Sequence, residues 1–289
     1  MSDAPRHAAT IVLVRPRAGG DGAPEIFLVK RHRKSGFMAS AYVYPGGKLD
    51  AEDSLPAVLA STSGLSAQAA FDRLAPSGPR LDDDAALTPE QALAVHVAGV
   101  REVFEEAGIL LAQGLDATED VLDAWRAEIN GELSFNALVA RESLTLRPDQ
   151  LHYFAHWITP SIESRRFNTR FFLAVAPDGQ EGYHDETETV DSAWLRPAEA
   201  LDRYSRGEIQ LAPPTFRTLE DMAAFDSADS LLSGMVPARV PTIMPRFDSI
   251  DGTMTMFMPG DPLYPSPVPV SGPTRVVLED GRWSSRSVE

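Results

Sequence analysis

REVFEEAGI, residues 101–109, is the stretch that decides the fold, because it sets three glutamates and one arginine within six residues and then reaches a glycine. Side chains three and four positions apart lie on one face of a helix. Glu102, Glu105 and Glu106 would therefore cluster and repel one another. Such a cluster is either the solvated face of an amphipathic helix or a cage for a doubly positive ion.

The sequence around this stretch predicts a long helix that ends at Gly108. Thr88 can cap its first turn, Pro89 suits the first helical position, and Gln91 completes a capping box. Gly108 supplies the stop. An apolar stripe at helical spacing would face the core, and it comprises Leu93, Val97, Val100, Val103 and Phe104.

The length allows one large globular domain or two small ones, and we expect a single domain over residues 1–289. No apolar run approaches the ~18 residues of a membrane span, and the first residues lack a secretory signal. The chain has no cysteine, which excludes disulfides, thiolate metal sites and cysteine nucleophiles. We therefore expect a cytoplasmic protein without a membrane partner. A formal charge of −16 argues against nucleic-acid binding but allows a small phosphorylated ligand beside a metal ion.

Strands are expected before the long helix and an irregular segment between them. Residues 8–14, 25–31 and 41–44 are apolar or β-branched, and the last of these runs into a Pro-Gly-Gly turn. Residues 54–87 are rich in Ala, Ser, Pro and Asp, with one short helix expected at 66–74. We interpret 54–87 as an insertion, which can bulge outward without disturbing the loop before it or the helix after it.

The carboxyl-terminal third is expected to add helices and then an extension. Helices are predicted at 197–206 and 214–225. From about residue 236 to 289 the chain becomes rich in proline, which predicts an extension that drapes over the domain or frays.

The residues quoted first resemble the second half of the Nudix box: Arg, Glu, an aliphatic residue, any residue, Glu, Glu, any residue, Gly and an aliphatic residue. Two departures are visible. Asp53 stands where the box has a glutamate, and the segment from Asp53 to Arg101 is far longer than usual, so an insertion interrupts the box. The resemblance implies an α/β/α sandwich with a mixed sheet, here with helical additions at the carboxyl end.

Further segments are similar to one subgroup, the coenzyme A diphosphatases with Nudix-type motif 19 and their bacterial relatives. They are GFMASAYVYPGGKLDAED, WITPSIESRRFNTRFFLAV, GEIQLAPPTFRTL and MPGDPLY. This resemblance implies hydrolysis of coenzyme A or acyl-coenzyme A to 3′,5′-ADP and a 4′-phosphopantetheine product. Alternatives are a Nudix pyrophosphatase for NADH or ADP-ribose, and a module that binds a nucleotide without hydrolysing it. Homodimers are common in the superfamily, so a homodimer is possible here.

Diphosphate hydrolysis itself favours clustered carboxylates, because Mg²⁺ or Mn²⁺ takes oxygen ligands and neutralises phosphate oxygens. We assign Glu105 and Glu106 as the main ligands and Glu102 as a further ligand or the base. Arg101 would orient Glu105. The resemblance adds the Gly47 carbonyl as a ligand.

Other candidates lie outside the box. A loop acid is expected in GYHDETETVDSAW (182–194), with Glu186 the first choice and Glu188 the second, although either could be a solvated loop residue. Arg166 and Arg170, in a predicted strand that sends Phe172 and Ala174 into the core, could reach the diphosphate or the 3′-phosphate.

Ordinary exposed arginines fit the pattern of that strand equally well. Arg31 is a third candidate for substrate binding, within LVKRHRKSGFMASAYVYPGG (28–47), which keeps part of the coenzyme A motif. His152, His156 and His184 are expected to pack or to lie in loops, since HYFAH lacks the glutamate of a metalloprotease helix.

Overall fold

The computed structural model describes residues 4–17, 19, 22–32, 40–76, 80–114, 117–185, 189–265 and 269–287. Within them the largest sheet comprises β1 (Arg6–Pro16), β2 (Pro24–Arg31), β3 (Tyr42–Val43), β4 (Gly46–Lys48), β7 (His152–Ile158), β8 (Phe167–Val175), β9 (Thr189–Leu195) and β10 (Thr242–Ile243). Its order is β10-β7-β8-β1-β2-β3, with β4 on β1 and β9 on β2. The sheet is mixed, since β1 runs parallel to β8 and antiparallel to β2.

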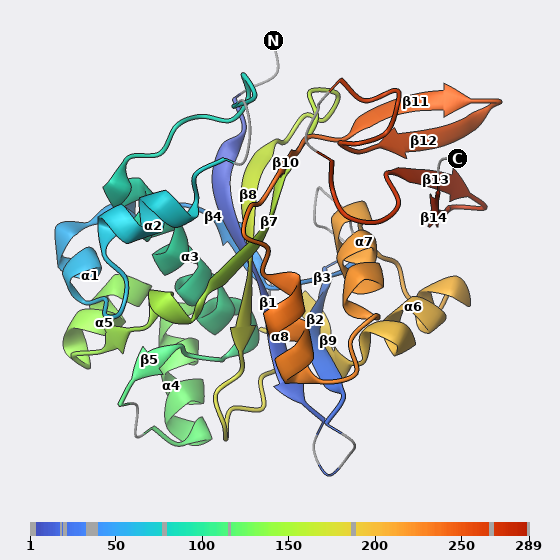
Figure 1. Cartoon of the computed structure of the whole chain (residues 1–289). Coiled ribbons are helices and arrows are strands. Elements are labelled where there is room, and N and C mark those ends of the chain that lie inside the picture. Colours follow the sequence, from blue (N-terminus) through green and yellow to red (C-terminus); the bar gives the residue numbers. More distant parts are fainter. Residues whose placement is uncertain are drawn as a thin grey trace.

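Helices cover both faces of this sheet (Figure 1). One group is α1 (Pro56–Ala60), α2 (Ala67–Arg73), α3 (Pro89–Ala107), α4 (Glu119–Ile129) and α5 (Phe135–Arg141); the other is α6 (Pro197–Ser205), α7 (Pro213–Met222) and α8 (Ala228–Met235). Strand alternation feeds two cores: Ile11 and Leu13 pack with the α3 side, Val12 and Val14 with the α6–α8 side. This confirms the α/β/α sandwich.

The predicted long helix is confirmed as α3. The Gln91 amide donates to Thr88 Oγ1 at 3.2 Å, and the Thr88 amide donates to Gln91 Oε1 at 2.9 Å, which completes the capping box. At the other end Gly108 has a φ of 72°, the left-handed conformation that glycine adopts without a Cβ clash. The predicted stripe is buried in the α3-side core. The predicted strands and carboxyl-terminal helices also form, with ends shifted by a few residues.

The insertion packs inward rather than outward. Its predicted helix forms as α2, capped by Ser66, but α1 was not expected and α2 lies against α3. Apolar side chains at Val58, Leu65 and Leu74 belong to the α3-side core. They are spaced irregularly among small and polar residues, so periodicity does not reveal their burial. The insertion is therefore part of one core layer and does not bulge outward.

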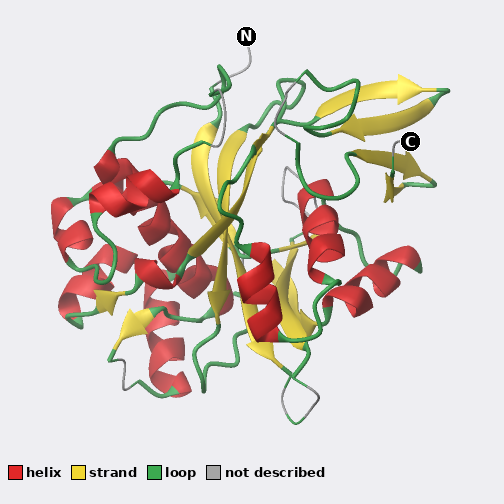
Figure 2. Cartoon of the chain, viewed as in Figure 1, coloured by secondary structure: helices red, strands yellow, loops and turns green. Residues whose placement is uncertain are grey.

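Further elements escaped the sequence analysis. A two-stranded sheet, β5 (Ala112–Gln113) with β6 (Thr145–Leu146), flanks α4 and α5, and short 3₁₀ helices η1 (Ala51–Ser54) and η2 (Pro148–Gln150) follow β4 and β6. The predicted extension contains β10 and an antiparallel sheet of β11 (Arg246–Ile250), β12 (Thr253–Phe257), β13 (Arg275–Glu279) and β14 (Arg282–Arg286) (Figure 2). Its residues Met256, Met258 and Val276 are buried against the α6–α8 side. Strands so short, in a proline-rich context, give little periodic signal.

No helix among the described residues combines the length and the apolar character that crossing a membrane requires.

Candidate active site

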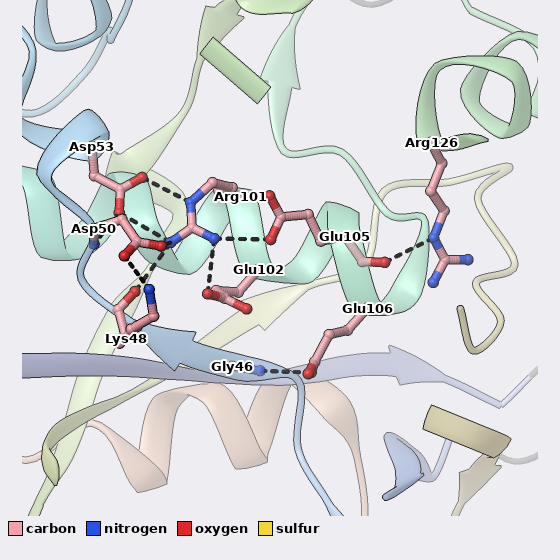
Figure 3. A network of polar contacts seen from close by, with 9 residues as sticks. All are labelled: Gly46, Lys48, Asp50, Asp53, Arg101, Glu102, Glu105, Glu106 and Arg126. Carbon is pink, nitrogen blue, oxygen red and sulfur yellow. Dashed lines mark hydrogen bonds and ion pairs between the residues drawn. The ribbon is translucent and has the colours of Figure 1, made fainter. Parts of the chain in front are cut away.

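The acidic end of α3 lies against strand β4, as Figure 3 shows. The Gly46 amide donates to Glu106 Oε2 at 3.0 Å, and the Glu106 side chain is buried. The Glu102 carboxylate lies so close to Gly47 that a Cβ at this glycine would overlap it. The Pro-Gly-Gly turn is thus held directly against two of the three predicted ligands, and a side chain at Gly47 would displace the Glu102 carboxylate.

Arg101 links the acidic helix to η1. Its Nε and Nη2 donate to the two Asp53 carboxylate oxygens at 2.8 and 3.0 Å, while Nη1 donates to Glu102 Oε1 and Glu105 Oε2, both at 2.8 Å. Nη2 also donates to the Lys48 carbonyl at 3.1 Å. Arg101 therefore meets Glu105 as predicted and holds Glu102 as well.

Asp53 is the acid that makes this arrangement possible, with none of its surface exposed. It also accepts the Asp50 amide at 2.8 Å. Burial lowers the pKa of Arg101, but the bonds from Asp53 and the charges of Glu102, Asp53 and Glu105 outweigh this and raise it above its usual value. The guanidinium is permanently positive. Asp53, which stands where the Nudix box has a glutamate, therefore keeps the negative charge that pairs with Arg101.

Glu105 lies in a setting that disfavours its charge. Burial raises the pKa of Glu105 above its usual value, although Arg101 acts in the opposite direction. Asp53 and Asp50 raise it further by repulsion. The acidic end of α3 therefore favours an additional positive charge.

The carboxylates at this end of α3 are the donors available to the metal ion that the sequence implies. In the described part of the chain, no three or more His, Cys, Asp or Glu side chains are grouped closely enough to hold one. Glu102 and Glu105 both accept hydrogen bonds from Arg101 there. The donors nevertheless fit Mg²⁺ or Mn²⁺ in kind, since all are carboxylate oxygens next to a backbone turn. The contact of Glu102 with Gly47 brings a side-chain oxygen to the backbone residue predicted to share the ion.

A cavity of about 350 Å³ opens beside this network. Arg101 and Glu105 line it, together with Asp50 and Glu52 of the η1 region and Phe135 and Asn136 of α5. The acidic end of α3 therefore borders a space that can receive a ligand.

Glu186 and Glu188 lie outside the described residues, so their predicted role stays a prediction. The residues on either side of them are hydrogen-bonded to each other, since the Thr189 amide donates to Asp185 Oδ1 at 2.8 Å. Arg31 lies opposite Thr189 in the pairing of β2 with β9. Its buried Nε has no hydrogen-bond partner among the described residues. Arg31 therefore lies next to Thr189, the first described residue after Glu186 and Glu188.

Arg166 and Arg170 lie apart from the acidic end of α3 and pair with acids of the insertion, so their predicted contact with substrate stays a prediction. Arg166 is buried and donates to Asp83 Oδ2 at 2.8 Å; Arg170 is 2% exposed and donates to Asp84 Oδ1 at 3.3 Å. The reason is strand alternation, since Arg170 shares its face of β8 with the core residue Phe172. Both guanidinium groups fasten the insertion to the sheet, so the placement offers no support for phosphate contact.

The histidines pack or occupy loops. His156 Nε2 lies 2.5 Å from Asn168 Oδ1, inside the core, and the His184 amide donates to Ser192 Oγ at 3.1 Å. His152 is exposed at the start of β7.

Sequence reasoning missed Arg126, which lies in α4 and reaches the end of α3. No motif marks it, because α4 was not predicted and its contacts are to backbone carbonyls.

Comparison with known proteins agrees with this geometry. The family model for the NUDT19 Nudix domain matches residues 5–222. The Homo sapiens protein named acyl-coenzyme A diphosphatase NUDT19 is 32% identical, over 90% of this chain and 80% of its own length. The Xenopus laevis protein of the same name is 27% identical, over 88% of this chain and 75% of its own length.

Among solved structures, a Nudix hydrolase from Alicyclobacillus acidocaldarius superposes with a TM-score of 0.60 at 26% identity. The superposition covers 81% of this chain and 97% of that one. With the split box assembled around Arg101, these matches show that the chain is a Nudix hydrolase and belongs to the family defined by the NUDT19 Nudix domain.

Proposed function

We propose that this Nudix hydrolase cleaves the diphosphate bond of coenzyme A or an acyl-coenzyme A, giving 3′,5′-ADP and the corresponding 4′-phosphopantetheine. The observation that carries the proposal is the acidic end of α3, where Arg101 organises Glu102 and Glu105 beside a cavity. Support for the substrate comes from the relatives named acyl-coenzyme A diphosphatase in Homo sapiens, Xenopus laevis and Gallus gallus.

The chemistry needs water to add to one phosphorus while the bridging P–O bond breaks. The leaving phosphate keeps the electron pair of that bond, and the attacking water loses a proton. Mg²⁺ or Mn²⁺ would neutralise the diphosphate oxygens and acidify the water. Glu105, Glu106, Glu102 and the Gly47 carbonyl would hold it, and Glu102 is alternatively the base.

The protein side chains contribute order and charge to this reaction. Arg101 bonds to both Glu102 and Glu105, which keeps the two carboxylates together and would limit how far they move when they take up the ion. Arg31, Arg166 and Arg170 are the candidates for a substrate phosphate, and of these Arg31 lies opposite Thr189 in the sheet. Glu186 would assist as a further acid from that loop.

A substrate panel tests the proposal. The purified chain is incubated with Mg²⁺ and then Mn²⁺ and with coenzyme A, acetyl-coenzyme A, NADH or ADP-ribose, and the products are identified by mass. Release of 3′,5′-ADP from the coenzyme A compounds alone is expected. Preferential turnover of NADH or ADP-ribose would keep the carboxylate site and replace the substrate.

A variant pair tests the carboxylates. Glu106→Gln removes a ligand charge at nearly constant volume, so metal-dependent turnover should be lost while the fold is kept. Glu90→Gln is the matched control, because Glu90 is exposed on the first turn of the same helix. Full activity in Glu106→Gln would remove the assignment of Glu106.

A further inference from the structure

Arg126 is a charged residue with only 3% of its surface exposed. It lies in α4, a helix between the Nudix box and β7, and its side chain reaches the last turn of α3 (Figure 3). A buried guanidinium loses its hydration, and this loss must be offset by hydrogen bonds in the protein. The position of those bonds indicates what Arg126 does.

The bonds join two separate parts of the site. Arg126 Nε donates to the Glu105 carbonyl at 2.9 Å, and Nη1 donates to the Tyr183 carbonyl at 2.8 Å. The Tyr183 amide in turn donates to the Ala107 carbonyl at 3.0 Å. One guanidinium therefore ties the last turn of α3 to the stretch that runs toward the acidic loop residues.

These contacts satisfy backbone groups that a helix leaves open. The last four carbonyls of a helix have no intrahelical donor. In α3 the Phe104 carbonyl is capped by the Gly108 amide, that of Glu105 by Arg126 and that of Ala107 by Tyr183. The C-terminal end of a helix carries a partial negative charge, which disfavours the glutamates placed there. The positive charge of Arg126 offsets this partial charge.

The tyrosine adds a second contact that fixes the same stretch. The Arg126 guanidinium lies 4.8 Å from the centre of the Tyr183 ring, and the Tyr183 hydroxyl donates to Asp123 of α4. Gly108 leaves room for the arrangement, since a Cβ there would lie 3.3 Å from Arg126 Nη1. Helix α4 thus holds Tyr183 from both ends.

We propose that Arg126 is a positioning residue, which holds Glu105 and Glu106 on the last turn of α3 in register with the loop after Gly182. It acts through the Glu105 and Tyr183 carbonyls and is too buried to touch substrate. Only the expected effect of Arg126 on kcat rests on the proposed function; its effects on Mn²⁺ affinity and on the Tyr183 amide do not.

The test compares Arg126→Met and Arg126→Lys with a control. Arg141→Met serves as the control, because Arg141 is an exposed arginine of the neighbouring α5 that pairs with Glu142 and with Glu128 of α4 but, within the described part of the chain, makes no ion pair or hydrogen bond to α3 or Tyr183. For each folded variant we would measure kcat and KM for coenzyme A, Mn²⁺ affinity without substrate, and hydrogen exchange at the Tyr183 amide.

Arg126→Met should lower kcat or Mn²⁺ affinity by about 10- to 100-fold, the range found when partners that orient metal ligands are removed. KM should change less than kcat. Hydrogen exchange at the Tyr183 amide should accelerate, since its bond to the Ala107 carbonyl depends on the contact between Arg126 and the Tyr183 carbonyl. Lysine should restore part of each effect, because it keeps the charge and one donor. The Arg141 variant should match the wild type.

Wild-type Mn²⁺ affinity and wild-type exchange at Tyr183 in folded Arg126→Met would overturn the proposal. A fall in activity that only follows the unfolded fraction would also overturn it, as it would show a role in stability alone. Should the methionine variant not fold, Arg126→Lys carries the same comparisons. If the wild type cleaves no coenzyme A, the proposed function fails, while Mn²⁺ binding and exchange still decide the role of Arg126.

Discussion

Replacing the buried Asp53 by asparagine should destabilise the protein far more than the same replacement at the partly exposed Asp50. Asp53 is fully buried and accepts two bonds from Arg101, at 2.8 and 3.0 Å. Asparagine keeps the shape and one acceptor, but it presents an NH₂ group to the guanidinium. Arg101 would then remain buried without the partner that offsets its lost hydration.

The magnitude follows from the contacts. Two charge-assisted bonds are each worth about 1.5 to 3 kcal/mol, and breaking a buried ion pair by removing one partner costs about 3 to 5 kcal/mol. Because Glu102 and Glu105 still neutralise Arg101, we expect a loss of about 3 kcal/mol in the free energy of unfolding. A protein of ordinary stability, about 5 to 15 kcal/mol, survives this loss folded.

The assay is urea denaturation of the metal-free protein, with equal m-values required for the comparison. Asp50→Asn is the matched control, since its carboxylate is 40% exposed and lies 3.8 Å from Arg101 Nη2. The control should lose about 1 kcal/mol or less. If Asp53→Asn is no less stable than Asp50→Asn, Asp53 does not hold the buried charge of Arg101 and the reasoning is refuted.

Three further changes give separable outcomes. Gly47→Ala should place a Cβ against the Glu102 carboxylate and lower metal-dependent kcat at least tenfold, measured with Mn²⁺ titrations. Asp84→Asn, which removes the acidic partner of the buried Arg170, should lower the free energy of unfolding by about 3 kcal/mol in urea. Burial lowers the pKa of His96 to about 4, so its stabilising effect is complete above the unfolded value of 6.5 and is lost as pH falls toward 4. His96→Met should therefore reduce the slope of stability against pH across that window by about 1.4 kcal/mol per unit, by denaturation at several pH values.

The sequence predicted the elements whose signals are local. Thr88, Gln91 and Gly108 fix the ends of α3 by their own backbone contacts, and the apolar alternation of β1 and β8 places both faces of the sheet. The box predicted that Arg101 meets Glu105. Each of these features depends on residues close together in the chain, so a single sequence contains the information.

Residues whose surroundings come from distant parts of the chain could not be predicted in this way. A charged residue in a strand normally indicates exposure, and the partners that offset the burial of Arg170 include His7 and Asp84, which lie far from it in the chain. Arg126 acts on backbone carbonyls, which leave no trace in the residue types of their owners. The four-stranded sheet near the carboxyl end is built from short strands that pair with each other, and its sequence shows no clear alternation.

The split box works because both of its halves are positioned by the same strand. Strand β4 pairs with β1 so that Gly47 lies opposite Ala9, and α3 approaches β1 so closely that a Cβ at Gly99 would collide with Ile11. The insertion leaves after η1 and returns at Thr88, and it closes on α3 and β8 through its own contacts. The distance between Asp53 and Arg101 along the chain therefore has no bearing on their distance in space, and an insertion of this length leaves the site intact.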